Sequence, residues 1–372
     1  MTSSFSPTVA EIDLEAFRYN VENFSQLASN SLLMAVIKTD AYGHGAVPIG
    51  KEAIKAGADR LGVTSVEEGI SLRENGVEVP IHLLSAVFSE QAADVVKHDL
   101  TASVSTSKLA ESLSKEALTL GKKIPVHLKI DTGLHRFGIT PAESISFCRD
   151  TYGLSGLEWE GIYTHFSSAD EGNWETTERQ FDLFLKTVMD LKRDGFEFPI
   201  RHAGASTIAI ERNDMHLDMI RPGAALFGYQ PEARQKELVT LKPVLRLKSR
   251  LLSVREFPPN TPVGYGGNYV TDRNQRLAVV PIGHGDGYQR SLSNKGEMLV
   301  NGKRAKIAGT ISLDQTIIDV TDIPDVREGD EVVIIGRQGD DAITAREVAG
   351  WMDSIVDEVL ASLMGRVRRI YH

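Results

Sequence analysis

The chain has 372 residues, of which 41% are hydrophobic and 25% charged, so it can bury a large core and has no composition typical of disorder. Its formal net charge of -10, from 41 basic and 51 acidic side chains, disfavours nonspecific binding to nucleic acid and to anionic membranes. We therefore expect a globular protein that acts on a small molecule, built from two domains or from one barrel with an appendage.

The sequence shows no signal for export or membrane insertion. Residues 1–17 lack a basic segment followed by an apolar one, and no apolar run approaches the length of a membrane span. Cys148 is the only cysteine, which excludes an intrachain disulfide. These features predict a cytoplasmic protein.

The first part of the chain predicts alternating strands and helices. Residues 8–14 alternate apolar and polar like a half-buried strand, and Asp13 can cap a helix whose apolar residues recur at helical spacing. Apolar runs then recur at intervals of roughly 20 to 40 residues, the size of a βα unit. The eight predicted strands are 32–37, 61–64, 81–84, 101–104, 126–130, 159–165, 200–203 and 226–227. Eight such units predict an α/β TIM barrel over residues 1–240, with the strand at 8–14 packing on a second domain.

Beyond residue 240 the pattern changes. Strand-like stretches follow one another across short turns, and a helix is predicted near the C-terminus, at 345–364. The stretches are 244–257, 276–283, 296–312, 315–320 and 330–336. Residues 241–372 therefore predict a mainly antiparallel β domain.

Lys38 directly follows the apolar strand at 32–37 and precedes a turn rich in glycine. In parallel α/β proteins the chemistry lies beyond the carboxyl ends of the strands. A lysine beside an apolar wall is partly desolvated, so its amine can be neutral and nucleophilic and can form a Schiff base. A lysine that extends its amine into solvent fits this stretch equally well.

Polar residues also mark the ends of later strands. In LKIDTGLHRFG, Lys129 lies within the apolar strand, where it needs a partner or a modification, and Arg136 lies beyond a glycine turn. His165 and His202 each end a strand. Strand-end histidines are more often held by local backbone hydrogen bonds than catalytic, so each residue alone is a weak indication.

Two turns contain small residues that let backbone amides approach an anion. Ser206 follows HAGA, and Gly223 and Ala224 follow Arg221 in IRPGAALFG. Ser206 could instead only cap a helix, and Arg221 could form an ordinary salt bridge. On successive strands of one barrel, however, a lysine, a phosphate cradle and a buried arginine together favour a functional site. In the second domain, VGYGG presents Tyr265 between glycines.

These residues make the chain closely similar to the alanine racemases, bacterial enzymes that hold pyridoxal 5'-phosphate (PLP) on a barrel followed by a β domain. The resemblance covers nearly the whole chain, through AVIKTDAYGHG, LKIDTGLHRFG, YTHF, IRPGAALFG, VGYGG, DGYQR, SLDQ and RVRRIY in the family's order. It implies interconversion of L-alanine and D-alanine, D-alanine supply for peptidoglycan, PLP as cofactor, and a homodimer with shared active sites. It implies no metal, nucleic acid or membrane.

The resemblance also implies roles for single residues. Lys38 would form the Schiff base with PLP and act as one acid/base group, and Tyr265 of the partner subunit would act on the opposite face of the substrate. Arg136 would favour the tyrosine phenolate, and Lys129 matches a position that is often carbamylated, which would make it an anion that holds Arg136.

Further implied roles concern the cofactor. Arg221 would hydrogen-bond the pyridine nitrogen and keep it unprotonated, which suppresses transamination, and His165 would orient Arg221. The phosphate would be held by Tyr42, Ser206 and the backbone of Gly223 and Ala224. The substrate carboxylate would be held by Arg136 and the backbone of Leu313.

The chain departs from the family's pattern around this site. His284 and Asp357 stand where the family usually has tyrosines, and they would line the entrance and specificity region with Asp170 and Arg290. Further departures are Thr310 for arginine, Leu313 for methionine and Ala205 for asparagine. These changes predict, as an alternative, a racemase of broader or altered specificity.

Two further hypotheses concern different classes of PLP-binding protein. A related PLP decarboxylase ordinarily has a cysteine as the acid in its β domain, whereas Cys148 falls in a helical stretch of the barrel. A non-catalytic PLP carrier would need only a barrel, so the second domain with Tyr265 argues against it.

Overall fold

The computed structural model describes residues 6–372, without the side chain of Ala233. The prediction that no leader is present concerns residues 1–17. Residues 1–5 of this segment lie outside the described residues. The chain forms two compact units. The barrel unit contains Glu15–Ala41 and Ala46–Lys242, and the β unit contains the chain up to Leu14, Tyr42–Gly45 and Pro243–His372. Among the helices of residues 6–372, none is both long and apolar enough to cross a membrane.

Eight parallel strands form the barrel, in the order β8-β7-β6-β5-β4-β3-β2-β9. Backbone hydrogen bonds connect the segment around β9 to that around β8, the two ends of this order. The N–H of Asp218 donates to the carbonyl of Arg201 at 3.0 Å, and that of Arg221 to the carbonyl of Gly204 at 2.9 Å. The strands are β2 (Leu32–Val36), β3 (Arg60–Val63), β4 (Ile81–Leu83), β5 (Leu100–Val104), β6 (Ile124–Lys129), β7 (Leu157–Tyr163), β8 (Ile200–His202) and β9 (Met219–Ile220). The predicted α/β barrel is confirmed.

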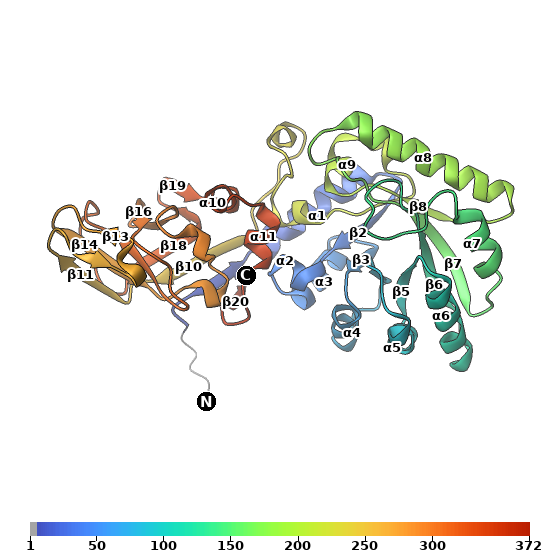
Figure 1. Cartoon of the computed structure of the whole chain (residues 1–372), viewed down its shortest axis with the longest axis horizontal. Coiled ribbons are helices and arrows are strands. Elements are labelled where there is room, and N and C mark those ends of the chain that lie inside the picture. Colours follow the sequence, from blue (N-terminus) through green and yellow to red (C-terminus); the bar gives the residue numbers. More distant parts are fainter. Residues whose placement is uncertain (1–5) are drawn as a thin grey trace. The chain divides into compact units, whose positions relative to one another are not determined.

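Helices cover the outside of these strands, as Figure 1 shows. Burial from both sides explains why β5 is buried at all five positions, as is typical of parallel strands. The helices are α1 (Leu14–Ala28), α2 (Lys38–Tyr42), α3 (Ala46–Lys55), α4 (Val66–Glu74), α5 (Ala92–Lys97), α6 (Ser107–Thr119), α7 (Ser144–Thr151), α8 (Trp174–Arg193) and α9 (Ser206–Glu211). Short 3-10 helices are η1 (Ser89–Gln91), η2 (Asn213–Met215), η3 (Ala224–Phe227) and η4 (Ala233–Glu237).

One predicted barrel strand is wrong. Residues 226–227 lie in η3, and the eighth strand is the two-residue β9. Leu226 and Phe227 are fully buried, and the Phe227 ring packs 5.5 Å from that of Phe17 on α1. Their apolar character therefore reflects packing under a helix, and a strand of two residues is too short to be recognised by a pattern.

The β unit is mainly antiparallel, as predicted. Its large sheet has the order β11-β14-β17-β16-β15-β18-β10-β1-β20, with β19 paired to β18, and β12 pairs with β13 separately. The strand β1 (Val9–Ile12) pairs antiparallel with β10 and parallel with β20. The other strands are β10 (Leu245–Arg250), β11 (Ser253–Phe257), β12 (Pro262–Val263), β13 (Tyr269–Val270), β14 (Gln275–Val280), β15 (Glu297–Val300), β16 (Lys303–Ile307), β17 (Thr316–Asp319), β18 (Glu331–Gln338), β19 (Asp341–Ile343) and β20 (Arg368–Tyr371).

The predicted C-terminal helix is divided in two. The helix α10 (Ala345–Met352) begins at a Thr344 cap and ends where Asp353 adopts a left-handed conformation, with φ of 57°, and α11 (Val356–Ala361) follows. Short 3-10 helices in this unit are η5 (Tyr265–Gly267), η6 (His284–Asp286) and η7 (Arg290–Leu292).

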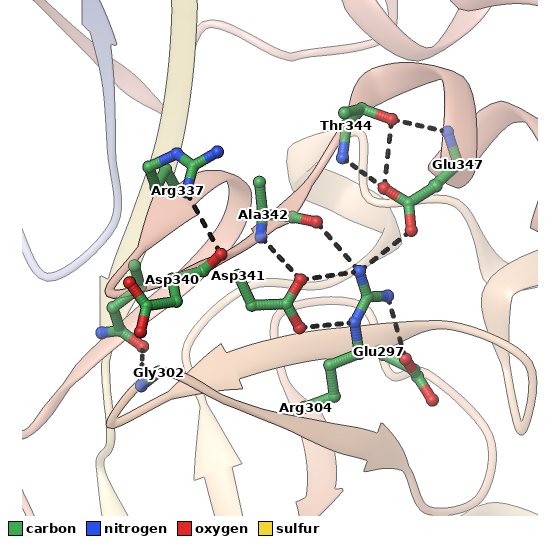
Figure 2. A network of polar contacts seen from close by, with 10 residues as sticks. Glu297, Gly302, Arg304, Arg337, Asp340, Asp341, Ala342, Thr344 and Glu347 are labelled. Atoms are coloured by element: carbon green, nitrogen blue, oxygen red, sulfur yellow. Dashed lines mark hydrogen bonds and ion pairs between the residues drawn. The ribbon is translucent and has the colours of Figure 1, made fainter.

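Arg304 connects several elements of the β unit (Figure 2). From β16 it donates to Asp341 at 2.8 and 3.2 Å, to Glu297 at 3.2 Å, to Glu347 at 3.0 Å and to the carbonyl of Ala342 at 2.9 Å. These acceptors lie on β15, β19 and α10, so one guanidinium links α10 to the sheet by hydrogen bonds.

Candidate active site

Lys38 lies half-buried at the end of β2, where the backbone turns left-handed. Thr39, Asp40, Ala41 and Tyr42 have φ between 51° and 55°. Such a conformation costs roughly 1–2 kcal/mol per residue, and strain of this kind clusters at functional sites. Asp40 holds the turn, because its carboxylate accepts the N–H of Ala46 at 2.7 Å and its own N–H donates to Glu68 at 3.1 Å. No pattern in the sequence indicates this turn, since left-handed positions are ordinarily glycine or asparagine.

Arg221 follows β9 and is 3% exposed. Its Nη1 donates to Nδ1 of His202 at 2.9 Å, and its Nη2 donates to the carbonyls of Thr164 and Ala203, both at 3.0 Å, and to Nδ1 of His165 at 3.3 Å. Burial lowers the pKa of Arg221 to about 10, so the group is still a cation at neutral pH. Within residues 6–372 no acceptor is hydrogen-bonded to its Nε.

A buried polar cluster, formed by His82, Ser103, His127, Tyr163 and His202, fills the barrel beside Arg221. Ser103 donates to the carbonyl of Leu83 (2.7 Å), so its Oγ accepts from Tyr163 at 2.6 Å and from Nε2 of His82 at 3.1 Å. The Tyr163 ring stacks on that of His202 with centroids 4.7 Å apart. Among these residues, only His202 is named from the sequence. The other four could have been recognised as polar side chains within otherwise apolar strands.

Three histidines of this cluster lie close enough to one another to act as ligands of one metal ion. One nitrogen each of His82, His127 and His202 lies within 4.8 Å of the others. However, His127 and His202 are hydrogen-bonded to each other at 2.8 Å. The positive charges of Arg221 and Arg60 add to burial in lowering the pKa of all three imidazoles, so the same charges oppose a cation here.

Lys129 is 1% exposed, and its Nζ donates to the carbonyl of Ile130 at 2.6 Å. Burial lowers the pKa of this amine to about 7, with the charges of Arg221 and Arg136 acting in the same direction. A neutral amine is the form that can react with carbon dioxide to give a carbamate. The structure gives no hydrogen bond between Lys129 and Arg136, both of which belong to the described residues.

The low pKa of Lys129 predicts a stability that depends on pH. The unfolded lysine keeps its proton up to about pH 10.5, the folded one only up to about pH 7, so the folded state gains stability as pH rises between these values. In carbon dioxide-depleted buffer, Lys129→Met should have a higher free energy of unfolding than the native protein at pH 6, and this advantage should shrink by roughly 3 kcal/mol between pH 6 and pH 9. Urea unfolding at both pH values measures this. Parallel pH dependence in the two proteins would contradict it.

Arg136 is exposed in the loop that follows β6. This loop is closed by a bridge between Ile130 and Ile139. The Asp131 carboxylate accepts the backbone N–H groups of residues 133, 134 and 135 at 3.0, 3.1 and 3.1 Å. A Cβ on Gly138 would lie 2.8 Å from the backbone nitrogen of Asp131, so the loop closes only with glycine there. The loop thus fixes the backbone on both sides of Arg136.

The structure brings the two predicted anion-binding turns together. The Oγ of Ser206, at the start of α9, accepts the N–H of Gly223 at 3.0 Å, and Ala224 follows at the start of η3. Ala205 caps α9 without a side-chain hydrogen bond. Tyr42 belongs to the β unit.

A cavity of about 60 Å³ lies beside His165 in the barrel unit. Asp170 and Thr207 line it, and Thr207 donates to the Asp170 carboxylate at 2.6 Å. Burial and the charges of Arg221 and Arg136 hold the pKa of His165 well below its ordinary value, so its imidazole is neutral.

The remaining predicted site residues lie in the β unit. Tyr265 is 70% exposed and stands between Gly264 and Gly266, which have φ of 71° and 76°. Asn268, from the same turn, donates to Thr310 at 3.2 Å.

The exposed His284 lies next to Leu313, which is 57% exposed. The N–H of Gly285 donates to the Leu313 carbonyl at 2.7 Å, and that of His284 donates to Ser312 at 3.0 Å. Asp357 is half-buried in the first turn of α11, and the exposed Arg290 begins η7.

Comparisons with known proteins agree with this geometry. Residues 12–231 match the model "Alanine racemase, N-terminal domain", and residues 244–371 match "Alanine racemase, C-terminal domain". An alanine racemase of Halothermothrix orenii is 42% identical over 98% of this chain and 97% of its own. The solved alanine racemase of Clostridium difficile superposes with a TM-score of 0.94 at 34% identity, covering 99% of this chain and 96% of the other. That of Bartonella henselae, solved with covalently bound pyridoxal phosphate, gives 0.89 at 27% identity and covers 99% and 100%.

Proposed function

The chain belongs to the alanine racemase family, and we propose that it interconverts L-alanine and D-alanine with PLP as its cofactor. The observation that carries this proposal is the pair of basic side chains at the same end of the barrel strands. Lys38 lies just beyond the end of β2 and Arg221 just beyond the end of β9, and β2 and β9 are neighbours in the barrel.

The residues present fit PLP. Arg221 is a buried cation whose acceptors are all neutral and whose Nε–H has no partner within residues 6–372, so it can donate to a neutral ring nitrogen. Ser206, Gly223 and Ala224 would hold the phosphate, with Tyr42. Lys38 supplies the amine for covalent attachment. When bound, PLP supplies an electron sink that makes the α-proton of an attached amino acid acidic.

Racemisation needs proton donors and acceptors on both faces of the α-carbon. We assign Lys38 to one face and Tyr265 of the partner subunit to the other, within a homodimer that shares its active sites. Tyrosine is a poor base at its ordinary pKa, so a cation must favour its phenolate, and Arg136 fits that role. Arg136 and the Leu313 backbone would hold the substrate carboxylate, and a carbamylated Lys129 would hold Arg136.

The proposal includes D-alanine supply for peptidoglycan and a cytoplasmic location, as expected for the family. It leaves a second candidate, a racemase with broader specificity. His284 is exposed and carries an imidazole, and Asp357 adds a carboxylate, where the family's pattern has tyrosines. A more polar approach to the site would admit larger side chains.

Proton exchange in deuterium oxide tests the function directly. The protein, loaded with PLP, is incubated with single L-amino acids and followed by NMR and chiral chromatography. Exchange with inversion confined to alanine supports the first function, whereas exchange of serine, lysine, arginine or methionine supports the second. Retention of PLP without any exchange contradicts both, and amine formation from lysine or arginine would indicate a decarboxylase.

If the entrance sets specificity, a His284→Tyr, Asp357→Tyr double variant should lose the larger substrates and keep alanine.

A further inference from the structure

A continuous chain of hydrogen bonds runs from Arg221 through the inside of the barrel to its other side. Nη1 of Arg221 bonds to Nδ1 of His202 (2.9 Å), Nε2 of His202 bonds to Nδ1 of His127 (2.8 Å), and Nε2 of His127 bonds to the carboxylate of Glu160 (2.9 Å). Arg60 closes the chain with two hydrogen bonds to Glu160, at 2.6 and 2.7 Å. Both imidazoles are fully buried, and Arg60 is 8% exposed.

We call this chain, from Arg221 through His202, His127 and Glu160 to Arg60, the relay. The chemistry of its two ends determines which ring nitrogen of each histidine carries the hydrogen. A guanidinium can only donate, so Nδ1 of His202 must accept and its Nε2 must carry the hydrogen. That hydrogen makes Nδ1 of His127 an acceptor and leaves the hydrogen of His127 on Nε2, which donates to Glu160. From the other end, burial raises the pKa of Glu160, but hydrogen bonds from His127 and Arg60 outweigh it and lower the pKa to about 2. The carboxylate is therefore an acceptor and demands the same tautomers.

The strand β7 is built locally for this relay. Its pairing with β6 shifts by one residue, because Val126 pairs with Trp159 and His127 with Gly161, so Glu160 is a bulge. A bulge of this kind re-aims a side chain. At Gly161 a Cβ would lie 2.4 Å from Cε1 and 2.5 Å from Nδ1 of His127, so the missing side chain makes room for the imidazole.

We propose that Glu160 and Arg60 are positioning residues for Arg221, acting through His127 and His202 from the other side of the barrel. Glu160 selects the tautomers that present a bare Nδ1 to the guanidinium, and Arg60 keeps Glu160 in place. The inference rests on the proposed function, because PLP is the group that Arg221 would face.

The consequence concerns the side reaction of the cofactor. With the relay intact, Arg221 is held as a pure donor, so it would keep the ring nitrogen of bound PLP unprotonated. If His202 presented an N–H at Nδ1, that hydrogen would meet a hydrogen of Arg221 and displace the guanidinium. A displaced Arg221 would no longer keep the ring nitrogen of bound PLP unprotonated. The cofactor would then be a stronger electron sink, which would favour transfer of the substrate amino group to it and release of pyruvate from alanine.

Neutron diffraction from crystals of the holoenzyme tests the tautomers without any activity measurement. We expect hydrogen, or exchanged deuterium, on Nε2 of both His127 and His202 and none on either Nδ1. Hydrogen on Nδ1 of either residue would overturn the proposal. This result is independent of whether the protein racemises alanine, so it separates the relay from the proposed function.

Variants test the effect on the cofactor. Glu160→Gln removes the carboxylate, and Gly161→Ala displaces the His127 ring while Glu160 and Arg60 remain. In both, the ratio of pyridoxamine phosphate formed to racemisation turnovers should rise about tenfold, the effect of weakening one hydrogen bond to a charged group. Glu52→Gln is the matched control, because Glu52 is a buried carboxylate paired with Arg18 in the same unit but outside the relay. An unchanged ratio in both relay variants, or an equal rise in the control, would overturn the proposal.

Discussion

Replacing Lys38 with alanine should reduce kcat/KM for racemisation at least about 10⁴-fold, because one change removes both the covalent attachment of the cofactor and one of the two acid/base groups. The rate is measured as α-proton exchange of alanine in deuterium oxide. Borohydride reduction of the native holoenzyme followed by peptide mass spectrometry should place the pyridoxyl group on Lys38.

The control for this change is Lys51→Ala. Lys51 is an exposed lysine on α3 of the same unit, and its loss should leave both the rate and the labelled peptide unchanged. Pyridoxyl label on another lysine of the native protein, or near-native exchange by Lys38→Ala, would remove Lys38 from the role proposed here.

The sequence predicted the barrel well because burial on both faces produces continuous apolar runs at a regular interval. It drew attention to Lys38 because that residue directly follows such a run, and to Ser206 and Arg221 because they lie in turns with small residues. The roles of all three stay predictions. The error at residues 226–227 has a physical cause. Buried apolar pairs look alike in a strand and in a turn packed under α1.

Two members of the relay, His202 and Arg221, are named from the sequence, but Arg60, His127 and Glu160 are not, because these three residues carry no local pattern. His127 and Glu160 lie inside predicted strands, and Arg60 lies at the edge of another, so only the barrel's closure brings them together. The bulge at Glu160 cannot be recognised from the sequence either. One inserted residue changes which side chains face inward, but it leaves the composition of the strand the same. The left-handed turn after Lys38 depends on Asp40 and Glu68, which are 28 residues apart.

Replacing Tyr265 with phenylalanine should slow racemisation by about 10²–10⁴-fold, the usual contribution of an acid/base group. It should also make the two enantiomers unequal. Lys38 can still remove and return a proton on its own face, so one enantiomer of alanine should exchange its α-proton with retention, while the other should hardly exchange. Tyr269→Phe is the control, because Tyr269 lies in the same unit and its hydroxyl is bonded to Gln275 and Asp319. Equal, near-native exchange of both enantiomers by Tyr265→Phe would exclude it as a base.

Mixing the two inactive variants decides whether the two bases of one site come from different subunits. In a symmetric dimer with shared sites, a chain lacking Lys38 and a chain lacking Tyr265 form one intact and one doubly defective site. After full subunit exchange, half of the dimers are mixed, so about a quarter of the native activity should return. The 70% exposure of Tyr265 in the single chain is what such sharing requires, because a base that serves another subunit must be accessible on its own. No recovery, with exchange verified by mass, would place both bases in one chain.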